Sequence, residues 1–158
     1  MKINAKNIAI NAIVACLYAV FTIMIAPLAY SQIQFRLSEI MVLLSFYNRK
    51  FIPGLVIGCF IANIPSTLGW LDIVFGTLGT FIVCFIMWYL KNRYLAIFIA
   101  SLMTGMIVGF ELYLAFGLPF IINFIYVFIG ELAVLVIGVI LFNSIEKNSK
   151  IKSFLLED

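Results

Sequence analysis

The 158-residue sequence contains no histidine, only three cysteines, and few charged residues, at 11% of the chain. Cys16, Cys59 and Cys84 lie inside apolar runs without the spacing of a metal site or disulfide framework, so we interpret them as buried packing residues. An average soluble protein is about 25% charged, whereas hydrophobic residues reach 65% here. A soluble domain of this length could not bury so much apolar surface. No metal or other cofactor is expected.

The basic residues that are present follow the apolar segments in a regular way. Nine of the ten fall into four clusters at every second junction between apolar runs: Lys2 and Lys6; Arg49 and Lys50; Lys91 and Arg93; Lys147, Lys150 and Lys152. By the positive-inside rule these junctions face the cytoplasm. The other junctions, around Ser31, Ser66 and Gly117, hold only Arg36 and are expected outside. The pattern predicts a multi-pass membrane protein with both termini in the cytoplasm, and its net charge of +3 gives no reason to expect nucleic acid as a partner.

The apolar runs predict an all-α fold of six transmembrane helices in a single domain over residues 1–158. We place the helices at residues 8–25, 37–47, 52–64, 71–90, 94–116 and 121–142. The second and third would cover only about 17 and 20 Å of a bilayer core about 30 Å thick. A re-entrant hairpin over residues 37–64 is the alternative, but it would bury Arg49 and Lys50, at about 2.5–3.5 kcal/mol or more for each charge. Six spans are therefore favoured.

Acidic residues inside the apolar zone are candidates for function, because membrane interiors rarely hold charges without a use. Four qualify: Glu39, Asp72, Glu111 and Glu131. Glu111 and Glu131 lie about 8 Å and about 15 Å from the outer turn along their helices, within reach of a cavity that opens outward. The alternative for these two is helix-packing hydrogen bonds. Asp72 could instead stabilise a helix start, and Arg36 and Glu39, three residues apart, could pair with each other.

Aromatic and amide side chains gather at the same outer level. An aromatic belt at the membrane interface would explain the tyrosines and tryptophan, but not the amides and carboxylates among them. Flat walls with a few directed polar groups suit a planar, polar heterocycle. The candidates are Tyr30, Gln32, Gln34, Phe35, Asn63, Trp70, Tyr113, Asn123 and Tyr126.

The first apolar run carries small residues at intervals of three and four, including Ala12, Ala15, Cys16 and Ala19. Such a stripe allows another helix to approach closely, either a partner subunit's or one of the chain's own. The sequence has no nucleotide-hydrolysing motif such as G-x-x-x-x-G-K, so a partner would have to supply the energy for transport.

Several segments together resemble the QueT family, the queuosine-precursor substrate-binding subunits (S components) of energy-coupling-factor (ECF) transporters. They are Gln34-Phe35-Arg36-Leu37-Ser38-Glu39, Gly58-Cys59-Phe60-Ile61-Ala62-Asn63 with the preceding Gly54, the stretch from Leu68 to Leu78, and Gly130-Glu131. The family usually has Ser where this chain has Thr77, which is a conservative departure. The resemblance covers nearly the whole chain.

The resemblance implies a non-enzymatic, multi-pass subunit in a bacterial plasma membrane. It would capture a 7-deazaguanine from outside, in the cyano or aminomethyl form or as queuine, and topple in the bilayer. One transmembrane coupling subunit and two ATPases would drive it, docking on the stripe that includes Ala15 and Ala19. Another planar vitamin as substrate, a small membrane enzyme, and a membrane scaffold without a transport role are the alternatives. We expect Glu131 to bind the guanine edge, with Glu111 as the second candidate.

Overall fold

The computed structural model describes residues 4–25 and 36–157, and within these ranges the chain is entirely helical, without strands. The elements are α1 (Ala5–Met24), the 3-10 helix η1 (Leu37–Val42), α3 (Leu43–Tyr47), the 3-10 helix η2 (Arg49–Phe51), α4 (Ile52–Asn63), α5 (Trp70–Tyr89), α6 (Arg93–Phe116), α7 (Phe120–Ile145) and α8 (Ser149–Leu156). The predicted all-α fold is confirmed. Five of the six predicted helices correspond to α1, α4, α5, α6 and α7 to within about three residues at each end, whereas the second corresponds to η1 followed by α3.

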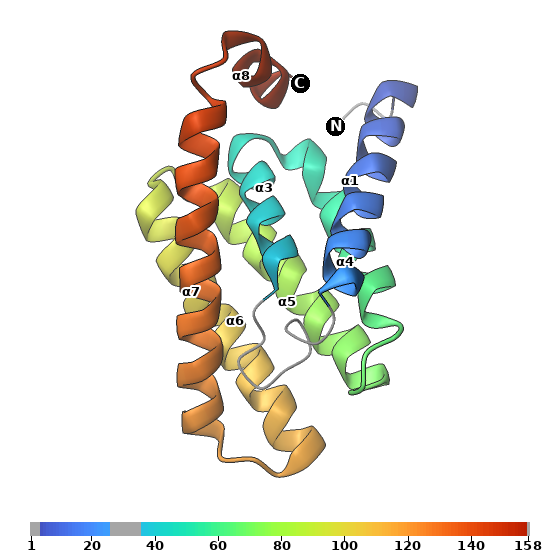
Figure 1. Cartoon of the computed structure of the whole chain (residues 1–158), viewed down its shortest axis with the longest axis vertical. Helices are drawn as coiled ribbons and strands as arrows, with labels where there is room; N and C mark the ends of the chain where they lie inside the picture. Colours follow the sequence, from blue (N-terminus) through green and yellow to red (C-terminus); the bar gives the residue numbers. More distant parts are fainter. Residues whose placement is uncertain (1–3, 26–35, 158) are drawn as a thin grey trace.

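Local sequence signals explain several helix ends. The Asn92 side chain accepts hydrogen bonds from the backbone N–H groups of Tyr94 and Leu95, and so caps the start of α6. Gly117 ends α6 with a φ of 66°, a left-handed conformation that glycine adopts without a steric penalty. Pro119 lies just before the start of α7. The helices α6 and α7 form an antiparallel pair joined by a short turn (Figure 1).

Four helices of the described chain are long and apolar enough to cross a membrane: α1, α5, α6 and α7. The segment predicted as the second span is shorter than these four helices and is divided into the 3-10 helix η1 and the α-helix α3. It lies at the centre of the bundle (Figure 1), where Val42 and Leu43 are buried. A Cβ on Gly138 of α7 would come within 2.6 Å of the Leu43 side chain, so this glycine lets the central segment pack closely. The count of six spans stays a prediction.

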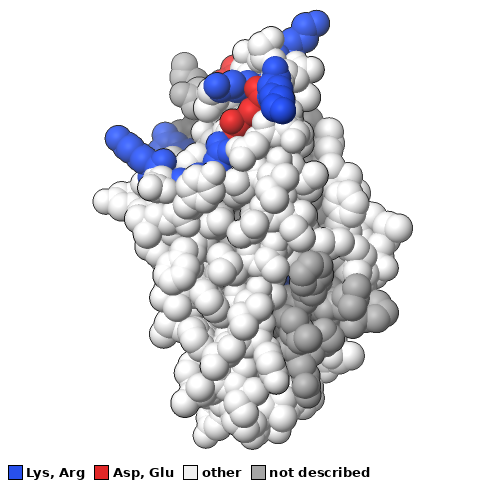
Figure 2. Space-filling view, turned by 60° about the vertical axis from the view of Figure 1, so that its left-hand side comes forward, with Lys and Arg blue, Asp and Glu red and all other residues white. Residues whose placement is uncertain are grey.

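The predicted basic clusters meet at one end of the molecule. Figure 2 shows the charged side chains gathered there, above a long surface nearly without them. Lys6 pairs with Glu157 at 3.2 Å, and Arg93 pairs with Glu146 at 2.6 Å. Glu146 is partly desolvated, which opposes ionisation, but hydrogen bonds from Tyr47 and Arg93 hold its pKa below the usual value. We call this the charged end.

The helix α8 covers the charged end. The Lys50 ammonium donates hydrogen bonds to the backbone oxygens of Phe154, at 3.1 Å, and of Glu157. Leu155 is the buried residue of α8 and lies on the side of the helix that faces the bundle, as expected for an amphipathic surface helix. Both ends of the described chain lie at this end, and the α6–α7 turn lies at the opposite end (Figure 1). That arrangement agrees with the alternation of basic clusters along the sequence.

Thiol labelling tests the sidedness that the positive-inside rule assigns. In a variant with Cys16 replaced by Ala, which keeps the buried Cys59 and Cys84, a cysteine introduced at exposed Asn92 should react with an impermeant thiol reagent only after the membrane is opened. A cysteine at exposed Thr67, between α4 and α5, should react in intact cells. Labelling of position 92 in intact cells would show that the charged end faces outward.

Candidate functional site

The interior of the bundle contains a cluster of charged and polar side chains drawn from most of its helices. None of its members exposes more than 6% of its surface. We define this buried polar cluster as Arg36, Glu39, Asn63, Asp72, Glu111 and Glu131. All six were predicted from the sequence as candidates, and the fold brings them into one region. Burial of so many ionisable groups at membrane depth is costly unless they are paired or used.

Arg36 and Asp72 form the ion pair of the cluster. The Nη2 atom of Arg36 lies 2.8 Å from Oδ1 and 3.0 Å from Oδ2 of Asp72. Asp72 is in the first turn of α5, where a carboxylate also stabilises the helix dipole. The ion pair therefore joins the start of η1 to the start of α5. Asp72 both stabilises the start of its helix and binds Arg36.

Glu39 is bound from α1. The Tyr18 hydroxyl, itself fully buried, donates a hydrogen bond to Glu39 Oε1. One turn further along α1, the hydroxyls of Thr22 and Ser38 are 2.6 Å apart. These contacts hold the η1 segment against α1 and fix the direction of the Glu39 side chain.

Asn63 connects α4 to α5. Its side-chain amide donates to the backbone oxygen of Asp72 at 2.9 Å, while its Oδ1 has no hydrogen-bond partner among the described residues. A Cβ on Gly76 would lie 2.4 Å from Asn63 Nδ2 and 2.8 Å from Asp72 Oδ1. Glycine at position 76 therefore gives these two side chains the space to meet.

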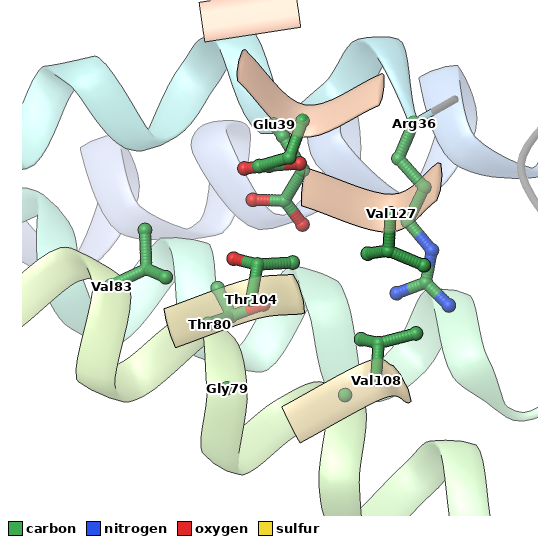
Figure 3. A pocket seen from close by; sticks show the side chains of 10 residues that line it. Arg36, Glu39, Gly79, Thr80, Val83, Thr104, Val108 and Val127 are labelled. Carbon is green, nitrogen blue, oxygen red and sulfur yellow. The ribbon is translucent and has the colours of Figure 1, made fainter. Parts of the chain in front are cut away.

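A small enclosed cavity lies beside the cluster. Its volume of about 20 Å³ has room for a single water molecule. Figure 3 shows the Arg36 guanidinium entering from one side, with the Glu39 carboxylate and the Thr104 side chain on the other. The lining residues come from η1 and its start, α5, α6 and α7: Arg36, Glu39, Gly76, Gly79, Thr80, Val83, Thr104, Val108, Val127 and Glu131.

Two carboxylates of the cluster have unused hydrogen-bonding capacity. Among the described residues, both side-chain oxygens of Glu111 and Oε1 of Glu131 are buried without a hydrogen-bond partner. The alternative of helix-packing hydrogen bonds is thus not realised for these atoms in the described chain. Buried polar atoms left unpaired cost about 1–3 kcal/mol each, more when charged. Glu131 lines the cavity, so its unpaired oxygen is suited to receiving a donor from a ligand.

The predicted aromatic candidates lie elsewhere. Trp70, Tyr113 and Tyr126 expose 69%, 50% and 48% of their surface, so they occupy the outside of the bundle, as the aromatic-belt alternative requires. Asn123 is buried, but its amide donates to the Pro119 carbonyl at 3.1 Å, a contact within its own helix start. None of these residues lines the cavity. The remaining candidates, Tyr30, Gln32, Gln34 and Phe35, lie outside the described residues.

The small-residue stripe of α1 is divided between two faces. Ala15 and Ala19 are each only 6% exposed, whereas Ala12 and Cys16 are exposed. A Cβ on Gly58 of α4 would lie 2.8 Å from the Ala15 carbonyl oxygen, so the α1 and α4 backbones are in close contact. Ala15 and Ala19 thus contribute to packing within the chain, and Ala15 also lines a groove between α1 and α4, so their role in docking stays a prediction.

Three residues of the site were not predicted from the sequence. Tyr18 binds Glu39, and Thr80 and Thr104 line the cavity. Thr80 also donates a hydrogen bond to Cys59 Sγ at 3.1 Å. Neutral hydroxyls are common in membrane helices and carry little signal. Tyr18 was recognisable as a residue with a polar tip inside an apolar run, more than one turn from either end of α1.

The fold and its buried ionisable residues define an α-helical, multi-pass membrane protein. The chain belongs to the QueT transporter family, which matches residues 8–147, as the sequence motifs indicated. The queuosine precursor transporter QueT of Lactococcus lactis subsp. cremoris (strain MG1363) is 29% identical over 164 aligned residues, which cover 92% of this chain and 95% of that protein. No solved structure matches the chain significantly.

Proposed function

We propose that this chain is the substrate-binding subunit of an ECF-type importer, located in a bacterial plasma membrane, and that it captures a 7-deazaguanine precursor of queuosine from outside. The name of the Lactococcus lactis relative supports the substrate class. The observation that carries the proposal is the pair of buried acids, Glu111 and Glu131, whose oxygens lack hydrogen-bond partners in the described chain.

The chemistry of these acids fits a guanine-like edge. That edge presents two N–H donors side by side, and a carboxylate is the side chain that accepts both. Glu131 lines the cavity and is assigned to the edge. Glu111 is not among the lining residues, so it ranks second for this role. Val108 and Val127, from α6 and α7, offer apolar contacts to the faces of a flat ring.

The bound form must be more open than the structure described here. Ligand pockets usually measure about 300–1,000 Å³, whereas this cavity measures about 20 Å³. A heterocycle can enter only if the segments around the cavity separate. Gln34, Tyr30 and Phe35 stay predicted members of the outer rim of that larger site.

Binding of deazaguanines to the purified protein tests the proposal. Titration calorimetry should give saturable binding of at least one of the three forms, the cyano base, the aminomethyl base or queuine. Guanine and an unrelated planar vitamin such as riboflavin serve as comparisons and should bind more weakly. If riboflavin or another vitamin binds and no deazaguanine does, the chain serves a different substrate of the same planar class.

The partners proposed for energy supply are one transmembrane coupling subunit and two ATPases. Their proposed docking surface is the exposed part of the α1 stripe, at Ala12 and Cys16. Ala12 borders an apolar groove between α1 and α4 that also includes Ile8, Pro53 and Ile57. Small side chains at the edge of such a groove let a partner helix approach the backbone.

Replacing Ala12 and Cys16 together by Leu should abolish ATP-driven uptake and leave ligand binding by the isolated subunit nearly unchanged. Uptake is measured with labelled substrate in cells that also produce the energising subunits. The matched variant with Ala15 and Ala19 replaced by Leu should instead fold poorly, because bulk there separates α1 from α4. Normal uptake by the Ala12 and Cys16 variant would exclude this face as the docking surface.

A further inference from the structure

An apolar groove lies on the surface of the bundle between α4 and α5. It measures about 470 Å³, within the usual range of ligand pockets, about 300–1,000 Å³. We call it the α4–α5 groove. In a membrane-spanning bundle, an exposed apolar surface of this kind contacts acyl chains. The groove is lined by Arg49, Ile52, Pro53, Val56, Ile57, Phe81, Phe85 and Trp88.

The groove begins at the charged end and runs along both helices toward the middle of the bundle. On α5, its residues Trp88, Phe85 and Phe81 are separated by three and four positions, so they share one face of the helix. They extend over about 10 Å along the helix axis. Arg49 lies in η2, just before the α4 wall at residues 52–57. The groove thus has a positive charge at its mouth and apolar walls below it.

The charge at the mouth is not used by another side chain of the described residues. The Cζ atom of Arg49 lies 5.7 Å from the ring centroid of Trp88, and the guanidinium has no hydrogen bond or ion pair within the described chain. By contrast, Lys6 and Arg93 pair with acids, and Lys50 binds backbone oxygens of α8. A guanidinium that stacks on a ring keeps its N–H donors for another partner.

These features match a ligand with an anionic head and an apolar tail. The planar fork of arginine donates two parallel hydrogen bonds to a phosphate group. Tryptophan is typical of the level at which headgroups meet acyl chains. The negatively charged lipids of the cytoplasmic leaflet attract basic residues at this level. Apolar walls that continue about 10 Å inward suit an acyl chain, which a free phosphate ion does not have.

A second copy of the chain fits this groove less well. Two-fold contact through the same face would bring two Arg49 side chains into one interface. None of the described residues that line the groove is acidic, so neither charge would gain a partner there. A phospholipid with a net negative charge supplies the partner that the groove itself lacks.

We infer that the α4–α5 groove binds an anionic phospholipid of the cytoplasmic leaflet. Its phosphate accepts hydrogen bonds from Arg49, and one acyl chain lies along Phe85 and Phe81. The groove shares no lining residue with the interior cavity, so this inference does not depend on the proposed substrate. A lipid held there connects η2 to the end of α5 at the charged end.

Quenching of tryptophan fluorescence by brominated lipids tests the inference. The chain has two tryptophans, Trp70 and Trp88, so the Trp70→Phe variant reports on the groove alone. The variant is reconstituted in phosphatidylcholine vesicles that contain a small fraction of brominated phosphatidylglycerol or, as the comparison, brominated phosphatidylcholine. Phosphatidylglycerol should associate with the Trp88 site about 5-fold more strongly, as expected for one basic residue near the membrane surface. Equal association of the two lipids would overturn the inference.

Substitutions of Arg49 in this background locate the preference. Arg49→Gln should bring the ratio of the two lipids close to one, and Arg49→Lys should retain part of the preference. Lys147→Gln, which removes an exposed base after α7, should leave the ratio unchanged. Continued quenching by brominated phosphatidylcholine shows that Trp88 still faces the lipid in each variant. An undiminished preference in Arg49→Gln would rule out Arg49 as the phosphate partner.

Two further outcomes would also contradict the lipid site. In the Trp88→Phe variant, Trp70 is the reporter, and it should show no preference for phosphatidylglycerol. An equal preference at Trp70 would mean a general attraction of anionic lipid to the protein instead of a site at Arg49. If neither lipid quenches Trp88, another protein surface covers the groove, and light scattering on the purified chain would identify a second copy as a dimer.

Discussion

Replacing Glu131 by Gln is expected to weaken binding of the deazaguanine about 10- to 150-fold. The substitution keeps the shape of the side chain but turns one acceptor into a donor, which then faces an N–H of the guanine edge. The site loses a charge-assisted hydrogen bond worth about 1.5–3 kcal/mol. Calorimetry on the purified variant measures the loss. Glu131 is the cavity-lining acid that has an oxygen without a hydrogen-bond partner among the described residues, which is why the loss is expected there.

A matched ligand separates recognition from general damage. A deazaguanine analogue without the exocyclic amine should bind weakly to the native protein and lose little more in Glu131→Gln. The loss of affinity caused by removing the amine and the loss caused by Glu131→Gln should therefore not add, because both changes remove the same contact. If Glu131→Gln binds the full ligand as tightly as the native protein does, Glu131 is a packing residue and another acid contacts the edge.

The class of protein and the helix positions could be predicted because their signals are local. Apolar runs and basic clusters are read along the chain, and five of the six predicted helices agree with the structure to within a few residues, the second being divided into η1 and α3. The depth of Glu111 and Glu131 could also be predicted, since depth follows from the rise per residue. Both are buried in the interior as expected.

Direction around a helix was the weaker part of the prediction. Tyr113 lies at nearly the same depth as Glu111. Two residues along an α-helix correspond to about 200° of rotation around the helix axis, so the tyrosine points outward while Glu111 is buried. The site candidates were grouped by depth alone, which placed Trp70 and Tyr126 with the ligand. The helical period, applied to each candidate relative to the buried acids, would have removed Tyr113.

Long-range partners could not be predicted at all. In the structure Arg36 pairs with Asp72, which is 36 residues away. Spacing along the sequence had suggested a pair between Arg36 and Glu39, which are three residues apart. The spacing of Ala15 and Ala19 predicted a close helix contact correctly, but not that α4 of the same chain makes it. Such pairings depend on how helices are arranged around one another, and a stripe of small residues is compatible with any helix.

Breaking the Arg36–Asp72 ion pair should have the largest effect on stability. Removal of one partner of a buried ion pair usually costs about 3–5 kcal/mol, because it leaves an uncompensated charge. The free energy of unfolding of Arg36→Met and Asp72→Asn, measured by denaturant titration in detergent micelles, should fall accordingly. An unchanged value for both variants would mean that the pair contributes nothing to stability.

The two variants should not be equal. Without Asp72, the guanidinium of Arg36 still lines the same cavity as Glu39 and Glu131, so its charge is partly compensated. Without Arg36, Asp72 and the other buried acids Glu39, Glu111 and Glu131 have no buried cation from the described chain nearby. We therefore expect Arg36→Met to be the more destabilising change.

The double variant, Arg36→Met with Asp72→Val, completes the comparison. It removes both charges of the pair and should recover part of the loss seen in Arg36→Met, since an apolar pair avoids the desolvation cost. Recovery should be incomplete, because Glu39, Glu111 and Glu131 then lack the positive charge of Arg36. Full recovery, or a larger loss in Asp72→Asn than in Arg36→Met, would mean that the other acids are not charged in the folded protein.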